Sequence, residues 1–220
     1  MFYGAAEFSR DLDLLVLIDE QNLEFLRNAL AELDAERIAV PDLLPEYLER
    51  GHAVHFRCRR TDVAGLRIDV MSVLRGVDGF EQLWERRTTI ESDGEEIDML
   101  SAADLAQAKR TQRDKDWPMV RRLVEQSYFR SRGDREAQDP RFWLSHLRTP
   151  SLLVSVASDH SEIARETCQV RPVVCAAILG DMPAITRLLA EEEAHEREAD
   201  VAYWQPLRAE LERLRRSRRG

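Results

Sequence analysis

The change in hydrophobic periodicity near residue 130 constrains the fold more than any other feature. Before that point, segments that alternate apolar and polar residues are typical of strands with one buried face, and helical repeats lie between them. Beyond residue 140 the apolar residues recur every three or four positions, which indicates helices alone. The polar stretch 130–139, RSRGDREAQD, separates the two patterns. We therefore expect an α/β domain over 1–129, a linker over 130–139 and a helical region over 140–220.

Two neighbouring segments give the clearest strand signal. In 52–60, HAVHFRCRR, apolar side chains occupy alternate positions from Val54, and in 65–72, GLRIDVMS, the same alternation recurs. The connection through 61–65 has the length of a hairpin loop, so we expect the two strands to pair antiparallel. Residues 11–18, DLDLLVLI, predict a further strand. The expected fold class is α/β, with a small mixed β-sheet flanked by helices and followed by an all-helical C-terminal extension.

The remaining elements are expected from apolar spacing, from capping residues such as Asp19 and Ser101, and from prolines and glycines at their ends. In the α/β domain these are helices over 20–33, 42–50, 80–86, 101–112 and 114–129, and a second hairpin over 88–99. In the helical region they are helices over 140–147, 151–157, 162–169, 172–179, 182–193 and 195–216.

Composition and charge exclude several classes of protein. The 220 residues are 44% hydrophobic and 33% charged, which is typical of a globular chain and not of a disordered one. The net charge is −9, and the first 100 residues carry 22 acidic residues against 11 Arg, so the chain does not suit non-specific binding along nucleic acid. No apolar run approaches the ~18 residues of a membrane span, and the first residues lack the basic start of a signal peptide.

The cysteines and the charged runs have simple interpretations. Three cysteines are too few, and odd in number, for a disulfide framework, so a reduced, cytoplasmic location is expected. Cys168 and Cys175 lie in helical patterns and are expected to pack in a core. The acidic run 191–200, EEEAHEREAD, predicts the charged face of a helix. The basic run 213–219, RLRRSRR, predicts a solvated chain end, with contact to RNA as the alternative.

His52, His55 and Cys58 stand three positions apart, a spacing that suggests a metal site at first sight. On a strand, however, residues three apart face opposite sides of the sheet, so these three side chains cannot share a zinc ion. His55, Arg57 and Arg59 instead share the polar side of their strand. We expect them either to face a substrate or to form a solvated strand face.

The sharpest chemical signal is the pair Asp11 and Asp13. Residues two apart on a strand point the same way, so both carboxylates share one face, where a divalent cation would relieve their repulsion. The alternative is a solvated strand end. Asp69 lies on the polar side of its own strand, and if the two strands are neighbours, three carboxylates converge. Such an oxygen-only site suits Mg²⁺ or Mn²⁺ rather than zinc. The alternative for Asp69 is pairing with Arg67 or Arg57.

These residues resemble a known family. The segment 4–13, GAAEFSRDLD, is similar to the G-x(4)-[ST]-[RK]-D-x-D motif of small bacterial nucleotidyltransferases of the polymerase-beta-like superfamily. In that family a strand pair with R-[IV]-D-[VL] follows, and then a pair of helices that carry lysines. Here the corresponding residues are Arg67-Ile68-Asp69-Val70, Lys109 and Lys115-Asp116. The resemblance covers about residues 2–127, and the order and spacing fit.

The resemblance implies a nucleotidyltransferase-like fold and specific roles for residues. Asp11, Asp13 and Asp69 would be catalytic carboxylates that bind Mg²⁺ or Mn²⁺. Ser9 and Arg10 would lie near the triphosphate. Arg57, Lys109 and Lys115 are candidate substrate contacts, although the two lysines could equally be ordinary solvated side chains.

The implied reaction transfers a nucleotidyl group from an NTP to an acceptor hydroxyl on RNA, on a protein or on a small molecule. Some relatives with this core are toxins of toxin–antitoxin pairs, so a cognate antitoxin is a candidate partner.

The sequence departs from the family at its start. The family has an upstream strand that ends in Gly-Gly or Gly-Ser and is followed by a helix, and amides of that glycine loop hold the nucleotide phosphates. Here Met1 falls inside or just after that helix. We expect the natural start to lie upstream. The alternative is a degenerate, non-catalytic nucleotide-binding or protein-interaction module of the same fold.

Overall fold

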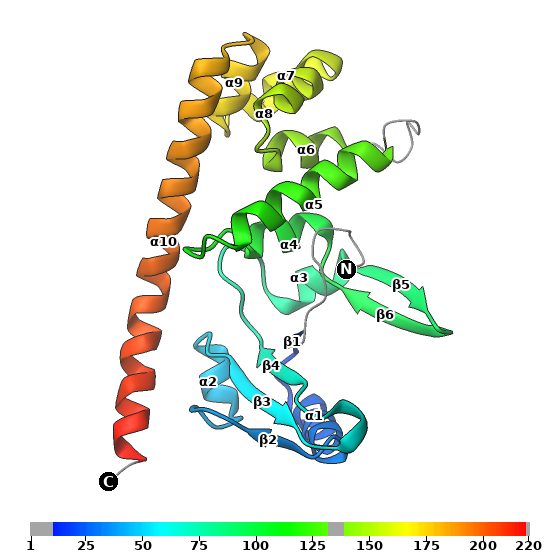
Figure 1. The fold of residues 1–220 in the computed structure, drawn as a ribbon, viewed down its shortest axis with the longest axis vertical. Helices are drawn as coiled ribbons and strands as arrows, with labels where there is room; N and C mark the ends of the chain where they lie inside the picture. Colours follow the sequence, from blue (N-terminus) through cyan, green and yellow to red (C-terminus); the bar gives the residue numbers. More distant parts are fainter. Residues whose placement is uncertain (1–10, 132–138, 219–220) are drawn as a thin grey trace. The chain divides into compact units, whose positions relative to one another are not determined.

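The computed structural model describes residues 11–131 and 139–218 (Figure 1). The fold is mixed α/β, with a small mixed sheet and a C-terminal helical part, as expected. The chain divides into two compact units. Among the described residues, the sheet unit consists of 11–100 with 202–218, and the helical unit consists of 101–131 with 139–201. Of the predicted linker over 130–139, residues 130, 131 and 139 belong to the helical unit, and residues 132–138 lie outside the described residues.

Most of the elements predicted for the first hundred residues form. The described elements are β1 (Asp11–Leu15), α1 (Glu20–Glu32), β2 (Ala35–Arg37), α2 (Pro45–Glu49), β3 (Val54–Cys58), the 3₁₀ turn η1 (Thr61–Val63), β4 (Arg67–Met71), α3 (Phe80–Glu85), β5 (Thr88–Ser92) and β6 (Glu95–Met99). Asp19 caps α1 as predicted, because its carboxylate accepts a 2.8 Å hydrogen bond from the backbone N–H of Asn22. Strand β2 has three residues, too few to show an alternating pattern, so the sequence does not predict it.

Four described strands form one sheet in the order β1-β4-β3-β2. Strand β3 pairs antiparallel with β4, which confirms the predicted hairpin, and also with β2. Strand β1 pairs parallel with β4, and the register places Asp13 opposite Asp69. One face of this sheet forms the core of the unit, where Phe56 and Ile68 are buried with Leu23 of α1. The opposite face therefore carries the polar side chains of the same strands.

Strands β5 and β6 form a separate two-stranded sheet (Figure 1). The predicted hairpin is confirmed, and Asp93 and Gly94 both have positive φ at its turn, 55° and 81°. A two-residue turn with positive φ at both positions is favoured in hairpins because its twist matches that of the strands.

The part of α10 (Met182–Ser217) beyond Val201 belongs to the sheet unit. Gly51 follows α2 with a φ of 93°, and a Cβ atom there would lie 2.5 Å from the phenol oxygen of Tyr203, so a larger residue would strain the backbone and displace Tyr203. The buried His52 imidazole contacts Glu210 of the helix, with Nε2 and Oε2 2.8 Å apart.

The described helices of the helical unit follow closely on one another. They are α4 (Ala102–Ala108), α5 (Asp116–Ser131), α6 (Pro140–His146), α7 (Pro150–Asp159), α8 (Ser161–Cys168), α9 (Pro172–Ile178) and the first part of α10. Three of them begin at Pro140, Pro150 and Pro172, since proline suits the first turn of a helix but not its interior.

The core of the helical unit joins α5 to the helices that follow. Val120 and Leu123 of α5 belong to the same buried cluster as Leu144, Leu153 and Val174. The sequence predicts burial of ten apolar residues in the helical region. Of these, Leu153, Val156, Val173, Val174, Ile185 and Leu189 are buried and Leu152, Ile163 and Leu188 are partly buried, whereas Ile178 is exposed. The helices from α6 to the first part of α10 therefore share one core with α5, whereas the part of α10 beyond Val201 belongs to the sheet unit.

Helix α10 differs from the prediction of two separate helices over 182–193 and 195–216. It is continuous from Met182 to Ser217, because residue 194 is an alanine and nothing there ends a helix; even Pro206 lies within it. No helix in the described part of the chain combines the length and the apolar character required to cross a membrane.

The acidic run 191–200 is more than a solvated helix face. Glu192 accepts hydrogen bonds from the guanidinium groups of Arg148 and Arg171, both of which are buried. The sequence interpretation missed this because the two arginines precede the run by 20 residues or more and only the fold brings them together.

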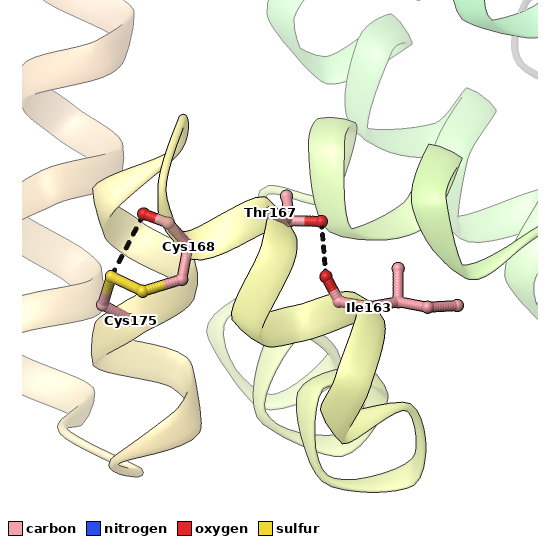
Figure 2. The surroundings of a disulfide bond; sticks show 4 residues. All are labelled: Ile163, Thr167, Cys168 and Cys175. Atoms are coloured by element: carbon pink, nitrogen blue, oxygen red, sulfur yellow. Dashed lines mark hydrogen bonds between the residues drawn. A yellow bond between two sulfur atoms is a disulfide. The ribbon is translucent and has the colours of Figure 1, made fainter.

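Cys168 and Cys175 form a disulfide bond, which corrects the expectation that both simply pack in a core (Figure 2). The bond joins the last residue of α8 to α9, and the two Cα atoms are 4.9 Å apart. Figure 2 also shows the Sγ atom of Cys175 near the carbonyl oxygen of Cys168, at 3.2 Å. Cys58 in β3 stays a buried thiol, and burial raises its pKa.

Candidate functional site

The polar side of the four-stranded sheet gathers the predicted carboxylates. In the parallel register Asp11 stands opposite Arg67, and Asp13 opposite Asp69. Residues in register on neighbouring strands point to the same side, so all three carboxylates share one face. Across the next strand pair, His55 stands opposite Asp69. We call this surface the carboxylate face; it consists of Asp11, Asp13, His55, Arg57, Arg67 and Asp69.

Arg67 is the positive charge at the centre of the carboxylate face. Its Nε donates a 2.7 Å hydrogen bond to Oδ1 of Asp69. This hydrogen bond is the main reason that the pKa of Arg67 is raised, and the attraction of the Asp69, Asp11 and Asp13 carboxylates raises it further. The guanidinium therefore interacts with all three carboxylates.

His55 completes the surroundings of Asp69. Its Nδ1 lies 2.8 Å from the same Oδ1 atom and 3.1 Å from Nη2 of Arg67. A carboxylate can only accept, so the short contact to Asp69 places a proton on Nδ1, and Arg67 then has no acceptor there. Two donors thus hold one oxygen of Asp69, whose side chain is 14% exposed.

The donor chemistry of this face fits a hard divalent cation, because carboxylate oxygens are the ligands that Mg²⁺ prefers. The side chains as they stand do not form a finished metal site: the described residues contain no group of three His, Cys, Asp or Glu side chains that could hold an ion. The alternative given for Asp69 in the sequence analysis, pairing with Arg67, is what the structure shows. A cation that binds Asp69 would have to share this carboxylate with Arg67 or displace the Arg67 guanidinium from it.

The other predicted site residues lie in different places. Arg57 is on the carboxylate face, where it is exposed and opposite Arg67 in the register. Ser9 and Arg10 lie outside the described residues. Lys109 caps the end of α4, and Lys115 precedes the start of α5; both belong to the helical unit.

Asp116, which follows Lys115 in the motif, is buried and has a local structural role. Its Oδ2 accepts a 2.8 Å hydrogen bond from Nε of Arg113 and a short one from Thr111, at the beginning of α5. A carboxylate in this position interacts favourably with the helix dipole. This part of the predicted motif thus contributes at least to helix formation.

Sequence reasoning placed His55 and Arg57 on the polar strand face but missed the central role of Arg67. The signal was present, because Arg67 and Asp69 are two positions apart on a strand and so share a face. That this arginine also interacts with Asp11 and Asp13 depends on the parallel pairing of β1 with β4, which no local pattern specifies.

A scan against protein-family models found no match, and searches of the curated proteins and of the solved structures found none either. The motif resemblance and the geometry of the carboxylate face are therefore the two observations on which a function can be proposed.

Proposed function

We propose that the chain is a Mg²⁺-dependent nucleotidyltransferase that moves a nucleotidyl group from an NTP to an acceptor hydroxyl on RNA, protein or a small molecule. The observation that carries this proposal is the parallel pairing that sets Asp11 and Asp13 beside Asp69 on one sheet face. For nucleotidyl transfer, the motif resemblance implies two acidic residues at alternate positions of one strand and a third on the neighbouring strand.

Each residue of the carboxylate face has a role in this proposal. Asp11 and Asp13 are exposed and would hold the divalent ion, which neutralises charge on the triphosphate during the reaction. Asp69, oriented by Arg67 and His55, would complete the site and take the proton of the acceptor hydroxyl. Arg57 is an exposed cation on the same face and would contact a phosphate.

Arg67 is the positioning residue of the proposed site. Without an ion, its guanidinium supplies the positive charge that offsets the repulsion among the three carboxylates on this face. With an ion bound, the same guanidinium would hold Asp69 from the side through Nε. Arg67 therefore links the stability of the free protein to the affinity of the site for a cation.

The second candidate is a non-catalytic nucleotide-binding or protein-interaction module of the same fold. One specific observation favours it: Asp69 Oδ1 is already occupied by two donors of the chain. In this alternative the carboxylate face is a closed ion-pair cluster, and nucleotide binding requires no divalent cation.

Label transfer separates the two candidates. We expect the purified chain, given Mg²⁺ and each labelled NTP with cell extract, to transfer label to an acceptor. Asp11→Asn keeps the size of the side chain but removes the charge, and should lower transfer by about two orders of magnitude or more. Asp78→Asn is the matched control, since Asp78 is an exposed residue that pairs with Arg86 in the same unit. Transfer that is equal in both variants, or nucleotide binding without transfer from any NTP, contradicts the enzymatic proposal.

A further inference from the structure

The disulfide in the helical unit lies where solvent can reach it. Cys168 and Cys175 are both half-buried, and Val170 in the connection between them is 83% exposed. Cys58, in contrast, is buried in the sheet unit, and burial raises its pKa. The bonded pair is thus within reach of a soluble thiol, whereas the Cys58 thiol is shielded from thiol-reactive reagents.

The connection between Cys168 and Cys175 contains Arg171, which links several helices of the helical unit; we call it the anchor. Arg171, the residue before α9, is buried, and its guanidinium contacts two other parts of the unit. It donates hydrogen bonds to the carbonyl oxygens of Leu144 at 2.6 Å and Leu147 at 3.0 Å, at the end of α6. It also donates to both carboxylate oxygens of Glu192 on α10, at 3.0 and 2.8 Å.

Backbone hydrogen bonds join this anchor to the turn that the disulfide closes. The N–H of Arg171 donates to the carbonyl oxygen of Thr167 at 2.8 Å, and the carbonyl oxygen of Arg171 accepts from Val174 at 3.0 Å. Cys168 directly follows Thr167 and Cys175 directly follows Val174, so the bond closes a ring of residues 168–175 that contains Arg171. Opening the bond removes the covalent restraint that holds this ring in place.

We propose that Cys168 and Cys175 are a reversible dithiol–disulfide site that controls how firmly Arg171 joins α6 to α10. The co-reactant is a soluble dithiol. Its thiolate attacks one sulfur of the bond and forms a mixed disulfide, and the other cysteine leaves as a thiolate and takes a proton. The second thiol of the reductant then displaces the first cysteine. Two cysteine thiols and one oxidised, cyclic reductant result, so two electrons and two protons have moved to the protein.

A reversible bond also agrees with the rest of the sequence. One pair in a chain of three cysteines is not a disulfide framework. The proposal is independent of nucleotidyl transfer, because it concerns residues of the helical unit alone.

Alkylation followed by mass spectrometry tests the bond itself. The folded chain is treated with iodoacetamide before and after equilibration with dithiothreitol. We expect Cys168 and Cys175 to be unmodified before reduction and to become alkylated together after it, with Cys58 protected in both cases. Oxidised dithiothreitol should restore the bond. Alkylation of the pair without reductant, or a bond that dithiothreitol leaves intact in the folded chain, overturns the proposal.

Hydrogen exchange tests the link to Arg171. Reduction should speed amide exchange of residues 144–147 and 189–193 about tenfold, because the anchored segments open locally more often. Cys168→Ser with Cys175→Ser should show the faster rates without reductant, whereas Cys58→Ser should behave as the wild type. In Arg171→Lys, which keeps the charge but loses the paired hydrogen bonds, reduction should add little. Exchange that does not change on reduction of the wild type overturns the proposed control.

Discussion

The two units use charged residues in opposite ways. In the helical unit, Arg148 and Arg171 are buried and hydrogen-bonded to carbonyl oxygens and to Glu192. In the sheet unit, Asp11 and Asp13 lie on a sheet face and are exposed. Buried charges must be fully paired, and removal of one partner is costly, whereas exposed charges contribute little to stability. The comparison indicates that the first set maintains the fold, whereas the second contributes little to it.

The pKa values support the same distinction. Burial lowers the pKa of Arg148 to about 10 despite the attraction of Glu192, and its guanidinium lies 4.6 Å from the centre of the Trp117 ring. Burial also lowers the pKa of His146 to about 3, and the positive charges of Arg110 and Arg171 add to this effect. In the sheet unit the pKa of Arg67 is raised, because the interaction with carboxylates outweighs burial.

The largest effect on stability is expected from Arg171→Leu. The change leaves Glu192 with one arginine fewer and the carbonyl oxygens of Leu144 and Leu147 without a donor, so unfolding should become easier by about 3–5 kcal/mol. Arg187→Leu is the matched control, because Arg187 pairs with Glu191 on the exposed side of α10 and should cost under about 0.5 kcal/mol. Urea unfolding measures both, and similar losses would contradict the comparison.

A smaller effect is expected from acid, through His146. Nδ1 of the half-buried His146 ring accepts a 2.8 Å hydrogen bond from Arg110, so the ring is neutral in the folded chain. Its folded pKa of about 3 lies below the ordinary value of 6.5, so the unfolded chain binds the proton first. Stability is therefore complete above pH 6.5 and falls as the pH drops toward 3. Between pH 6.5 and 4.5 the loss from this residue should be about 2 kcal/mol.

His146→Asn measures that loss, because its amide oxygen replaces Nδ1 as the acceptor but does not titrate. The difference in unfolding free energy between wild type and variant should change with pH over this window. Unfolding is followed by the fluorescence of Trp117 and Trp143, in a background in which Trp84→Phe and Trp204→Phe remove the other two tryptophans. His195→Asn, at an exposed histidine, should show no such difference. A wild-type curve parallel to that of His146→Asn would show that the His146 ring does not govern the acid response.

The smallest effect on stability is expected from Arg67→Gln. Arg67 is 38% exposed, so loss of its pair with Asp69 should cost under about 1 kcal/mol. The substitution should change the affinity for Mg²⁺ more than it changes stability. Because the three carboxylates repel one another without the guanidinium, Mg²⁺ should raise the melting temperature of Arg67→Gln at lower concentrations than it does for the wild type. Arg60→Gln removes a pair of the same spacing, with Asp62, and should leave the Mg²⁺ response unchanged. An Mg²⁺ response that is the same in all three proteins would contradict the role of Arg67.

The fold was predictable where the chain carries a strong local pattern. Alternation in β3 and β4, the cap at Asp19 and the turn at Asp93 and Gly94 all have local causes, and each is confirmed. The disulfide could not be predicted locally, because it depends on the turn that brings α8 and α9 together. The predicted break in α10 was wrong for a local reason, because no residue near 194 ends a helix.

The sequence predicted which carboxylates share a face, but not which groups those carboxylates contact. The two-residue spacing of Asp11 and Asp13 indicates a shared face whatever the neighbouring strand is. The sequence left open whether Asp69 would face a cation or an arginine, because both require the same strand pattern. Only the positions of Arg67 and His55 around Oδ1 distinguish the two, and these follow from strand register and side-chain rotamers.

The central claim is that the carboxylate face holds a divalent cation. Electron paramagnetic resonance of Mn²⁺ tests it directly, because the free ion gives a strong signal that is lost on binding. The account predicts that the wild type binds Mn²⁺ and that Asp13→Asn binds it at least about tenfold more weakly, while Glu96→Gln, on the exposed face of β6, binds it as the wild type does. Equal Mn²⁺ affinity in the wild type and Asp13→Asn would contradict the account.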